Sequence, residues 1–222
     1  MTDIDLLWLR TLEELGDRAA HEIKDTLNGV SLSLEVVRGR SGMTSSASSS
    51  VSDFAATAAA QLELVTERIE AMLVLSRRPR EPADVAMTLR RLASLMVPAA
   101  KADGASLTVE GAEGSATTRA AAQATRLALG ALLLQLVRHG GGKCRLEAGP
   151  ASPANGNGGG IHGSDGRAAV VRFSHEAADA CTLDPEIQST IEEHGIRVEQ
   201  GHAREEGGRR FAETLLVFPG YP

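Results

Sequence analysis

Two runs of apolar residues, spaced by three or four positions, constrain the fold of this chain more than any other feature. The runs comprise Ile23, Leu27, Val30, Leu34 and Val37, and then Phe54, Ala58, Leu62, Val65, Ile69 and Met72. Such spacing places apolar side chains along one stripe of an α-helix and is typical of coiled-coil seams. Glycine and serine predominate in residues 39–50, which interrupt the helical pattern. The sequence therefore predicts two long helices, at about residues 3–40 and 51–77, joined as an antiparallel hairpin.

A single hairpin leaves part of both apolar stripes uncovered, because each helix has only one neighbour. Two hairpins cover the stripes when they associate as a dimeric four-helix bundle, so we expect a homodimer. Pro79 and Pro82 end the second helix, and we place a domain boundary between them. Residues 1–80 are then the dimerisation hairpin, and residues 81–222 are a second domain.

The second domain mixes helical and strand patterns, which predicts an α+β fold with helices on one face of a sheet. Helices are expected at about residues 84–101, 119–139 and 185–194, and strands at about 106–110, 144–148, 168–173, 196–200 and 211–218. Asp84 is the expected N-cap of the first helix. The glycine-rich residues 156–160 do not connect a strand to a helix as a phosphate loop does, so we interpret them as a linker.

Charge and composition exclude several functional classes. The formal net charge of −6 argues against a general nucleic-acid binder, because phosphate binding requires a basic surface. The two cysteines, Cys144 and Cys181, form no disulfide framework and are expected to be free buried thiols. Residues 1–10 lack a signal-peptide pattern, and the longest apolar stretch, residues 127–137, is too short to cross a bilayer. We therefore expect a cytoplasmic protein without membrane contact.

His21 is the residue of the first helix best placed for chemistry. It precedes Ile23 by two positions, about 200° around a helix, so it points away from the apolar seam into water. Glu22 is adjacent, and Asp25 and Asn28 follow on the same face as His21. A neutral imidazole nitrogen attacks phosphorus, and a carboxylate can hold the other ring nitrogen's proton and fix the tautomer. The alternative interpretation is a surface histidine among solvated side chains.

Several stretches resemble the core of sensor histidine kinases. His21-Glu22-Ile23-Lys24-Asp25-Thr26-Leu27-Asn28 resembles the H-box of that family. Residues 84–92 and 101–107 resemble the start of its ATP-binding domain, and residues 191–199 and 211–219 resemble the elements that close it. The resemblance covers nearly the whole chain and implies a phosphoacceptor role for His21 and a kinase-like α/β sandwich for the second domain. It also implies that Glu22 acts as a base or orients the ring.

The chain departs from this family at the nucleotide site. The helix that matches the magnesium-holding N-box has Gln135 where the family has asparagine. Residues 174–179 lack the glycines of the Asp-x-Gly-x-Gly loop, and residues 183–188 replace the second glycine box, whose backbone amides approach phosphates. We therefore expect a degenerate, pseudokinase-like fold that binds no nucleotide cofactor.

Two departures in the H-box bear on its shape and activity. Asp25 stands where the family has Asn or Thr, a position linked to dephosphorylation of the partner, so phosphatase activity is not implied. Thr26 replaces the usual proline, so the helix should lack the family's kink. The other histidines show no metal-ligand spacing, so no metal site is expected; they are His139, His162, His175, His194 and His202.

These departures make the chain similar to sporulation-type histidine phosphotransferases, which are built on degenerate kinase folds. The resemblance implies a two-component phosphorelay in which His21 carries phosphate between aspartates of response-regulator receiver domains. The receiver domain would supply magnesium, so none need bind to this chain. Two alternatives stay open: a non-catalytic scaffold that docks a receiver domain or a kinase, and a divergent active histidine kinase.

Overall fold

The computed structural model describes residues 3–40, 48–79, 82–150, 167–176, 180–201, 204–206 and 209–220. Its helices are α1 (Asp3–Arg40), α2 (Ser48–Ser76), α3 (Val85–Ala102), α4 (Ala122–Arg138) and α5 (Pro185–Glu193). Its strands are β1 (Ala83–Asp84), β2 (Ser106–Glu110), β3 (Thr117–Thr118), β4 (Gly141–Pro150), β5 (Arg167–Glu176), β6 (Arg197–Gln200), β7 (Arg204–Glu206) and β8 (Arg209–Phe218). The glycine-rich linker expected at residues 156–160 lies outside the described residues.

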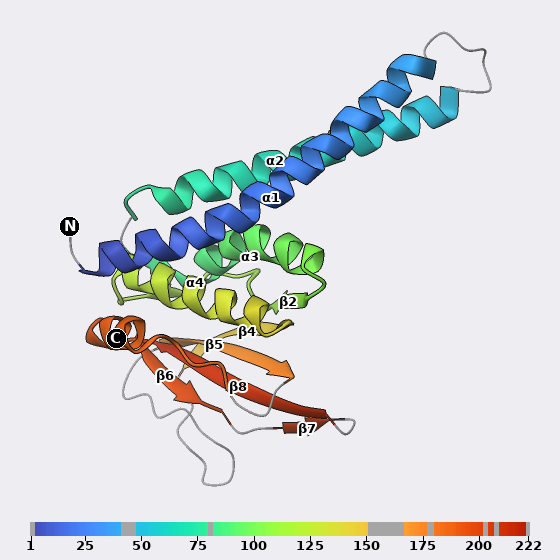
Figure 1. Cartoon of the computed structure of the whole chain (residues 1–222). Coiled ribbons are helices and arrows are strands. Elements are labelled where there is room, and N and C mark those ends of the chain that lie inside the picture. Colours follow the sequence, from blue (N-terminus) through green and yellow to red (C-terminus); the bar gives the residue numbers. More distant parts are fainter. Residues whose placement is uncertain are drawn as a thin grey trace.

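The helices α1 and α2 form the predicted hairpin, and their connected ends project well beyond the rest of the molecule (Figure 1). The bounds of α1 match those expected, and α2 begins three residues earlier than expected, at Ser48. The helix α1 is continuous through Thr26, and the absence of a kink at that position stays a prediction.

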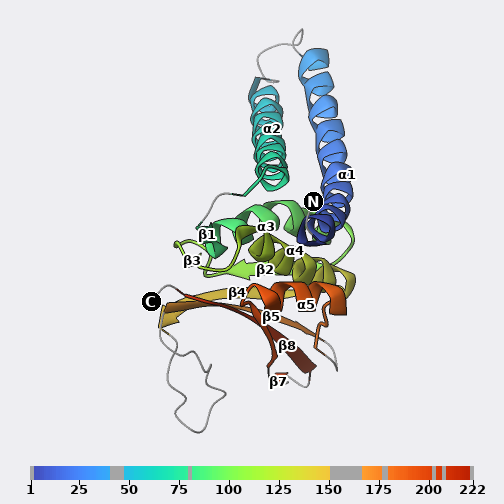
Figure 2. The ribbon, with the colours of Figure 1, turned by 90° about the vertical axis from the view of Figure 1, so that its left-hand side faces the viewer.

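Below the hairpin, α3 and α4 lie between its base and one face of a mixed sheet (Figures 1 and 2). The strand order is β2-β4-β5-β8-β6, and β7 pairs with β8. The strands β2 and β4 are parallel and the other pairs are antiparallel, which confirms the expected sheet with helices on one face. A separate ladder of β1 and β3 was not expected, because two residues per strand are too few to show a periodicity.

The helix α3 begins as the sequence predicts. The side chain of Asp84 accepts a hydrogen bond of 2.9 Å from the backbone N–H of Met87, one of the donors that the first turn of a helix leaves unpaired. The positions expected to face inward are all buried; they are Val85, Leu89, Leu92, Leu95 and Met96.

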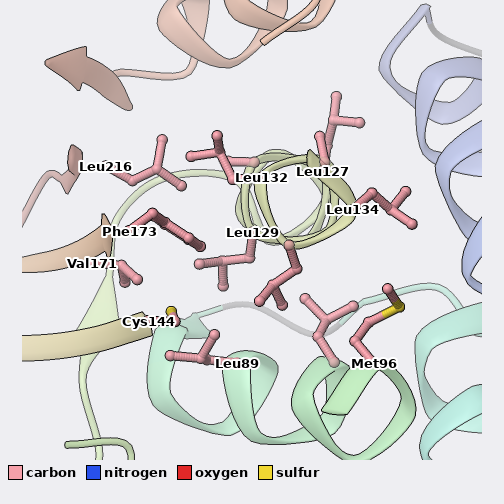
Figure 3. Close-up of a cluster of buried hydrophobic side chains, with 14 of the residues drawn as sticks. Leu89, Met96, Leu127, Leu129, Leu132, Leu134, Cys144, Val171, Phe173 and Leu216 are labelled. Carbon is pink, nitrogen blue, oxygen red and sulfur yellow. The ribbon is translucent and has the colours of Figure 1, made fainter. Parts of the chain in front are cut away.

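The main core lies around α4, which contributes buried side chains on most of its faces (Figure 3). Leu129 and Leu132 pack there against Phe173 of β5 and Leu216 of β8. The chain is poor in aromatic residues, so leucines supply most of the buried volume. Both cysteines are free and buried, as predicted.

The base of the hairpin belongs to the same core. Trp8 and Leu15 of α1 and Leu75 of α2 are buried in one cluster with the side chains of α3 and α4. Gly130 of α4 permits this approach, because a Cβ there would lie 3.3 Å from the Trp8 ring. The domain boundary placed between residues 80 and 81 therefore marks the end of α2, and its division of the chain into two units stays a prediction.

A buried arginine holds the C-terminal end of α2 against α4. Arg126 donates hydrogen bonds of 3.1, 3.1 and 2.7 Å to the backbone carbonyls of Val74, Leu75 and Arg77. The last carbonyls of a helix have no partner within it, and a guanidinium supplies several donors in one plane. Burial, together with the nearby charge of Arg91, lowers the pKa of Arg126, although arginine stays protonated at neutral pH.

Replacing Arg126 with methionine should destabilise the protein. Methionine retains most of the apolar stem but donates no hydrogen bond. The carbonyls of Val74 and Arg77 lose this donor and that of Leu75 keeps only Trp8, so the free energy of unfolding should fall by about 2–4 kcal/mol. Urea unfolding at a fixed protein concentration measures this change. The exposed Arg119 is a matched control, and Arg119→Met should change the free energy by less than about 0.5 kcal/mol. Equal effects of the two substitutions would show that the Arg126 hydrogen bonds do not anchor α2.

Candidate functional site

His21 lies on α1 where the helix leaves the shared core. Leu15 and Ala19, six and two residues before it, are buried in the main cluster. Arg18 forms an ion pair of 2.7 Å with Asp103, at the C-terminal end of α3. His21 follows three residues later and its side chain is exposed, as predicted from its angle to the seam. The histidine therefore stands at the root of the projecting hairpin, on a helix fixed to the sandwich below.

The other predicted site residues lie on the same helix. Asp25 and Asn28 are exposed and Glu22 is half-buried. The hydroxyl of Thr26 donates a 2.7 Å hydrogen bond to the carbonyl of Glu22, and Arg68 of α2 donates to the Thr26 hydroxyl at 3.2 Å. The ion pairs found among the described residues do not include His21, so the ring is not held by Glu22 in this conformation.

Half of each apolar seam remains uncovered on the hairpin. On α1, Val30 is buried and Ile23 and Val37, seven positions to either side, are half-buried against α2. The alternate positions Leu27 and Leu34 are 40% and 51% exposed. The helix α2 repeats the pattern, because Ala58 and Val65 are buried whereas Leu62 and Ile69 are each 44% exposed. One set of heptad positions thus joins α1 to α2, and the other set faces outward.

The helix face that matches the N-box lines a hollow of about 480 Å³ between α1, α4 and α5. Gln135 is half-buried there, beside an ion pair of 2.7 Å between Arg138 and Glu14 of α1. Three acidic side chains and two basic ones line the hollow, so its net charge does not attract phosphate groups; they are Glu14, Asp184, Glu186, Arg10 and Arg138. The hollow therefore presents the longer side-chain amide of Gln135 where the family has asparagine, and the absence of nucleotide binding stays a prediction.

The N-terminus of α5 is occupied by the chain itself. A free helix N-terminus attracts phosphate because its backbone N–H groups lack partners. Here the carboxylate of Asp184 accepts a 2.8 Å hydrogen bond from the backbone N–H of Glu186, and Pro185 carries no N–H. The segment that replaces the second glycine box thus caps its helix with an acidic side chain. Residues 177–179, in the other expected loop, lie outside the described residues.

The fold also brings together three residues that sequence spacing did not connect. His139 is the C-cap of α4, His175 lies near the end of β5, and Cys181 lies between β5 and α5. Their ligand atoms all lie within 4.8 Å of one another. Because the three residues come from three separate elements, no motif of fixed spacing could reveal them. The alternation of His175 with Phe173 and Val171 on β5 did carry a signal, since it predicts that His175 points inward.

Burial sets the charge state of this group. Desolvation lowers the pKa of His175, and the nearby His139 lowers it further, so the imidazole of His175 is neutral at physiological pH. Burial raises the pKa of the Cys181 thiol to about 11. The Cys181 sulfur lies 3.5 Å from Nδ1 and 3.8 Å from Nε2 of His175. The two rings of His139 and His175 have their centroids 5.0 Å apart.

Comparisons with known proteins place this geometry in context. No family model matches the chain, and no curated protein matches its sequence. Among solved structures, the chain is similar to the Acinetobacter baumannii histidine kinase AdeS, with a TM-score of 0.42 and 9% identity over 91% of this chain and 98% of that one. None of the described helices is long and apolar enough to cross a membrane. The roles of individual residues therefore depend on the chain's own geometry.

Proposed function

We propose that this chain is a histidine phosphotransferase of two-component signalling. His21 would take a phosphoryl group from a phospho-aspartate of one response-regulator receiver domain and pass it to an aspartate of another. The observation that carries this proposal is the placement of His21, an exposed imidazole on a continuous helix that is anchored to the sandwich one turn earlier. A phosphoryl carrier needs a histidine that a partner's active site can enclose, and a projecting helix offers one.

The transfer would use groups that the chain and its partner supply together. A neutral ring nitrogen of His21 attacks phosphorus, the bond from phosphorus to the aspartate oxygen breaks, and the aspartate leaves as a carboxylate. Magnesium bound to the receiver domain would neutralise the phosphoryl oxygens. Glu22 would accept the proton of the other ring nitrogen once the ring turns toward it, and Asp25 and Asn28 would line the rim of the contact.

The uncovered seam supports a homodimer. Leu27, Leu34, Leu62 and Ile69 repeat at heptad spacing on the outer side of the hairpin, and a monomer would expose them together. A second hairpin packed against these positions gives each helix two neighbours, which is the arrangement of a four-helix bundle. His21 is exposed on α1 and would stay accessible in such a bundle, because it lies away from the seam.

The same proposal predicts that ATP does not bind. Titration calorimetry with ATP, with and without magnesium, should show no binding in the micromolar range. The reasons are the carboxylate cap of α5, the excess of acidic over basic side chains lining the hollow beside Gln135, and the missing glycine boxes. A micromolar dissociation constant for ATP would favour the divergent kinase instead.

The experiment that tests the function is transfer from a partner. Receiver domains from the same organism would be phosphorylated with a small-molecule phosphodonor, purified from it and mixed with the chain. We expect label to move to the chain within the lifetime of the phospho-aspartate. A complex that forms without any movement of label would favour the scaffold, which docks a receiver domain but performs no chemistry.

A further inference from the structure

The group of His139, His175 and Cys181 has the composition of a metal site. Imidazole nitrogen and thiolate sulfur are the ligands that zinc prefers in proteins. Bonds of about 2.0–2.3 Å to a tetrahedral ion place neighbouring ligand atoms about 3.3–3.8 Å apart. The Cys181 sulfur and Nδ1 of His175 are already 3.5 Å apart, and all three ligand atoms lie within 4.8 Å of one another. A small rotation of the exposed His139 side chain would bring its ring nitrogen into this range.

Burial makes the site suitable for a tightly held ion. His175 and Cys181 are each only 2% exposed, so bulk water has little access to their ligand atoms and would not compete with a bound ion for them. His139 is exposed and closes the group from the solvent side. The Cys181 sulfur approaches Nδ1 and Nε2 of His175 at 3.5 and 3.8 Å, so the thiol and the imidazole already lie side by side as two ligands of one ion would.

We propose that His139, His175 and Cys181 bind one divalent ion of the zinc class. The described residues supply three ligands, and water would complete a tetrahedral shell. On binding, the Cys181 sulfur–hydrogen bond breaks, the sulfur–metal bond forms, and the proton passes to solvent. This site is separate from His21 and does not depend on the proposed phosphotransfer.

The ion would join three elements of the fold. His139 follows the last residue of α4, His175 lies on β5, and Cys181 begins the segment that leads into α5. The backbone carbonyl of Cys181 also accepts a 2.8 Å hydrogen bond from the Thr214 hydroxyl of β8, which holds this segment against the sheet. Metal binding should therefore stabilise the folded chain and raise its melting temperature, because the unfolded chain does not hold these ligands together.

Titration with Co²⁺ under anaerobic conditions tests the proposal, since cobalt replaces zinc and reports its ligands by absorption. We expect one equivalent per chain, a near-ultraviolet band from thiolate-to-cobalt charge transfer, and the visible bands of a four-coordinate ion. Added Zn²⁺ should remove these bands. A wild-type titration without a thiolate band would overturn the proposal.

Matched variants separate this site from binding elsewhere on the chain. Cys181→Ser should lose the thiolate band, whereas Cys144→Ser, at the other buried cysteine, should keep it. His139→Ala should weaken Co²⁺ binding by more than about tenfold. His194→Ala is its control, because His194 is likewise an exposed C-cap, on α5. His139 is exposed, so its variant remains informative if Cys181→Ser does not fold. Full affinity in His139→Ala, or a thiolate band that survives Cys181→Ser, would contradict the assignment.

Discussion

Replacing His21 with glutamine is expected to abolish phosphoryl transfer from a phosphorylated receiver domain while leaving the fold intact. Glutamine is similar in size and polarity but has no nucleophilic nitrogen, and position 21 is exposed, so stability should change by less than about 0.5 kcal/mol. Loss of a nucleophile typically reduces a reaction by more than about a thousandfold. The measurement is the rate at which label appears on the chain after mixing with the phosphorylated receiver domain.

Two further variants separate the nucleophile from its surroundings. His194→Gln makes the same change at another exposed histidine, the C-cap of α5. This variant should transfer at the wild-type rate. Glu22→Gln should slow transfer without abolishing it, because the carboxylate orients the ring and does not attack phosphorus. Label on His21→Gln at the wild-type rate would exclude His21 as the acceptor.

Replacing Leu27 or Ile69 with aspartate is expected to convert a dimer into a monomer. Both positions are exposed in the single chain, so an aspartate there does not disturb the hairpin core. In a two-fold symmetric bundle each substitution buries two carboxylates in an apolar seam, which should weaken the dimer by about a thousandfold or more. Light scattering at micromolar concentration measures the change in mass.

Controls for the dimer use the other face of α1. Asn28→Asp introduces the same carboxylate at an exposed position away from the seam, and Lys24→Ala removes an exposed charge. Both variants should remain dimers. A wild-type chain that is monomeric at micromolar concentration, or a Leu27→Asp variant that keeps the dimer mass, would rule out association through this seam.

The sequence predicted the helices well where a periodicity extends over several turns. The seams through Val30 and Val65 placed α1 and α2 within a few residues, and Asp84 placed the start of α3. It did not predict how the base of α1 packs on α4, because the contact of Trp8 with Gly130 joins positions far apart in the chain. Arg126 was overlooked for the same reason: its role as a cap for α2 depends on tertiary packing.

The candidate sites show the same division between local and distant information. The exposure of His21 follows from its angle to Ile23 on one helix, so the sequence sufficed. Whether Glu22 contacts the ring depends on side-chain rotamers and on a partner, which a helical pattern does not determine. The group of His175 and Cys181 with His139 forms only when α4, β5 and the segment before α5 come together.

Locating the phosphoryl group on the labelled wild-type chain is the decisive measurement. The chain would be phosphorylated by a receiver domain, digested at neutral to alkaline pH, where a phosphoramidate is stable, and mapped by tandem mass spectrometry. We predict that the modification lies on His21 and is lost on brief acid treatment. Modification of a different residue, or no modified peptide from a chain that binds the phosphorylated receiver domain, would contradict the role proposed for His21.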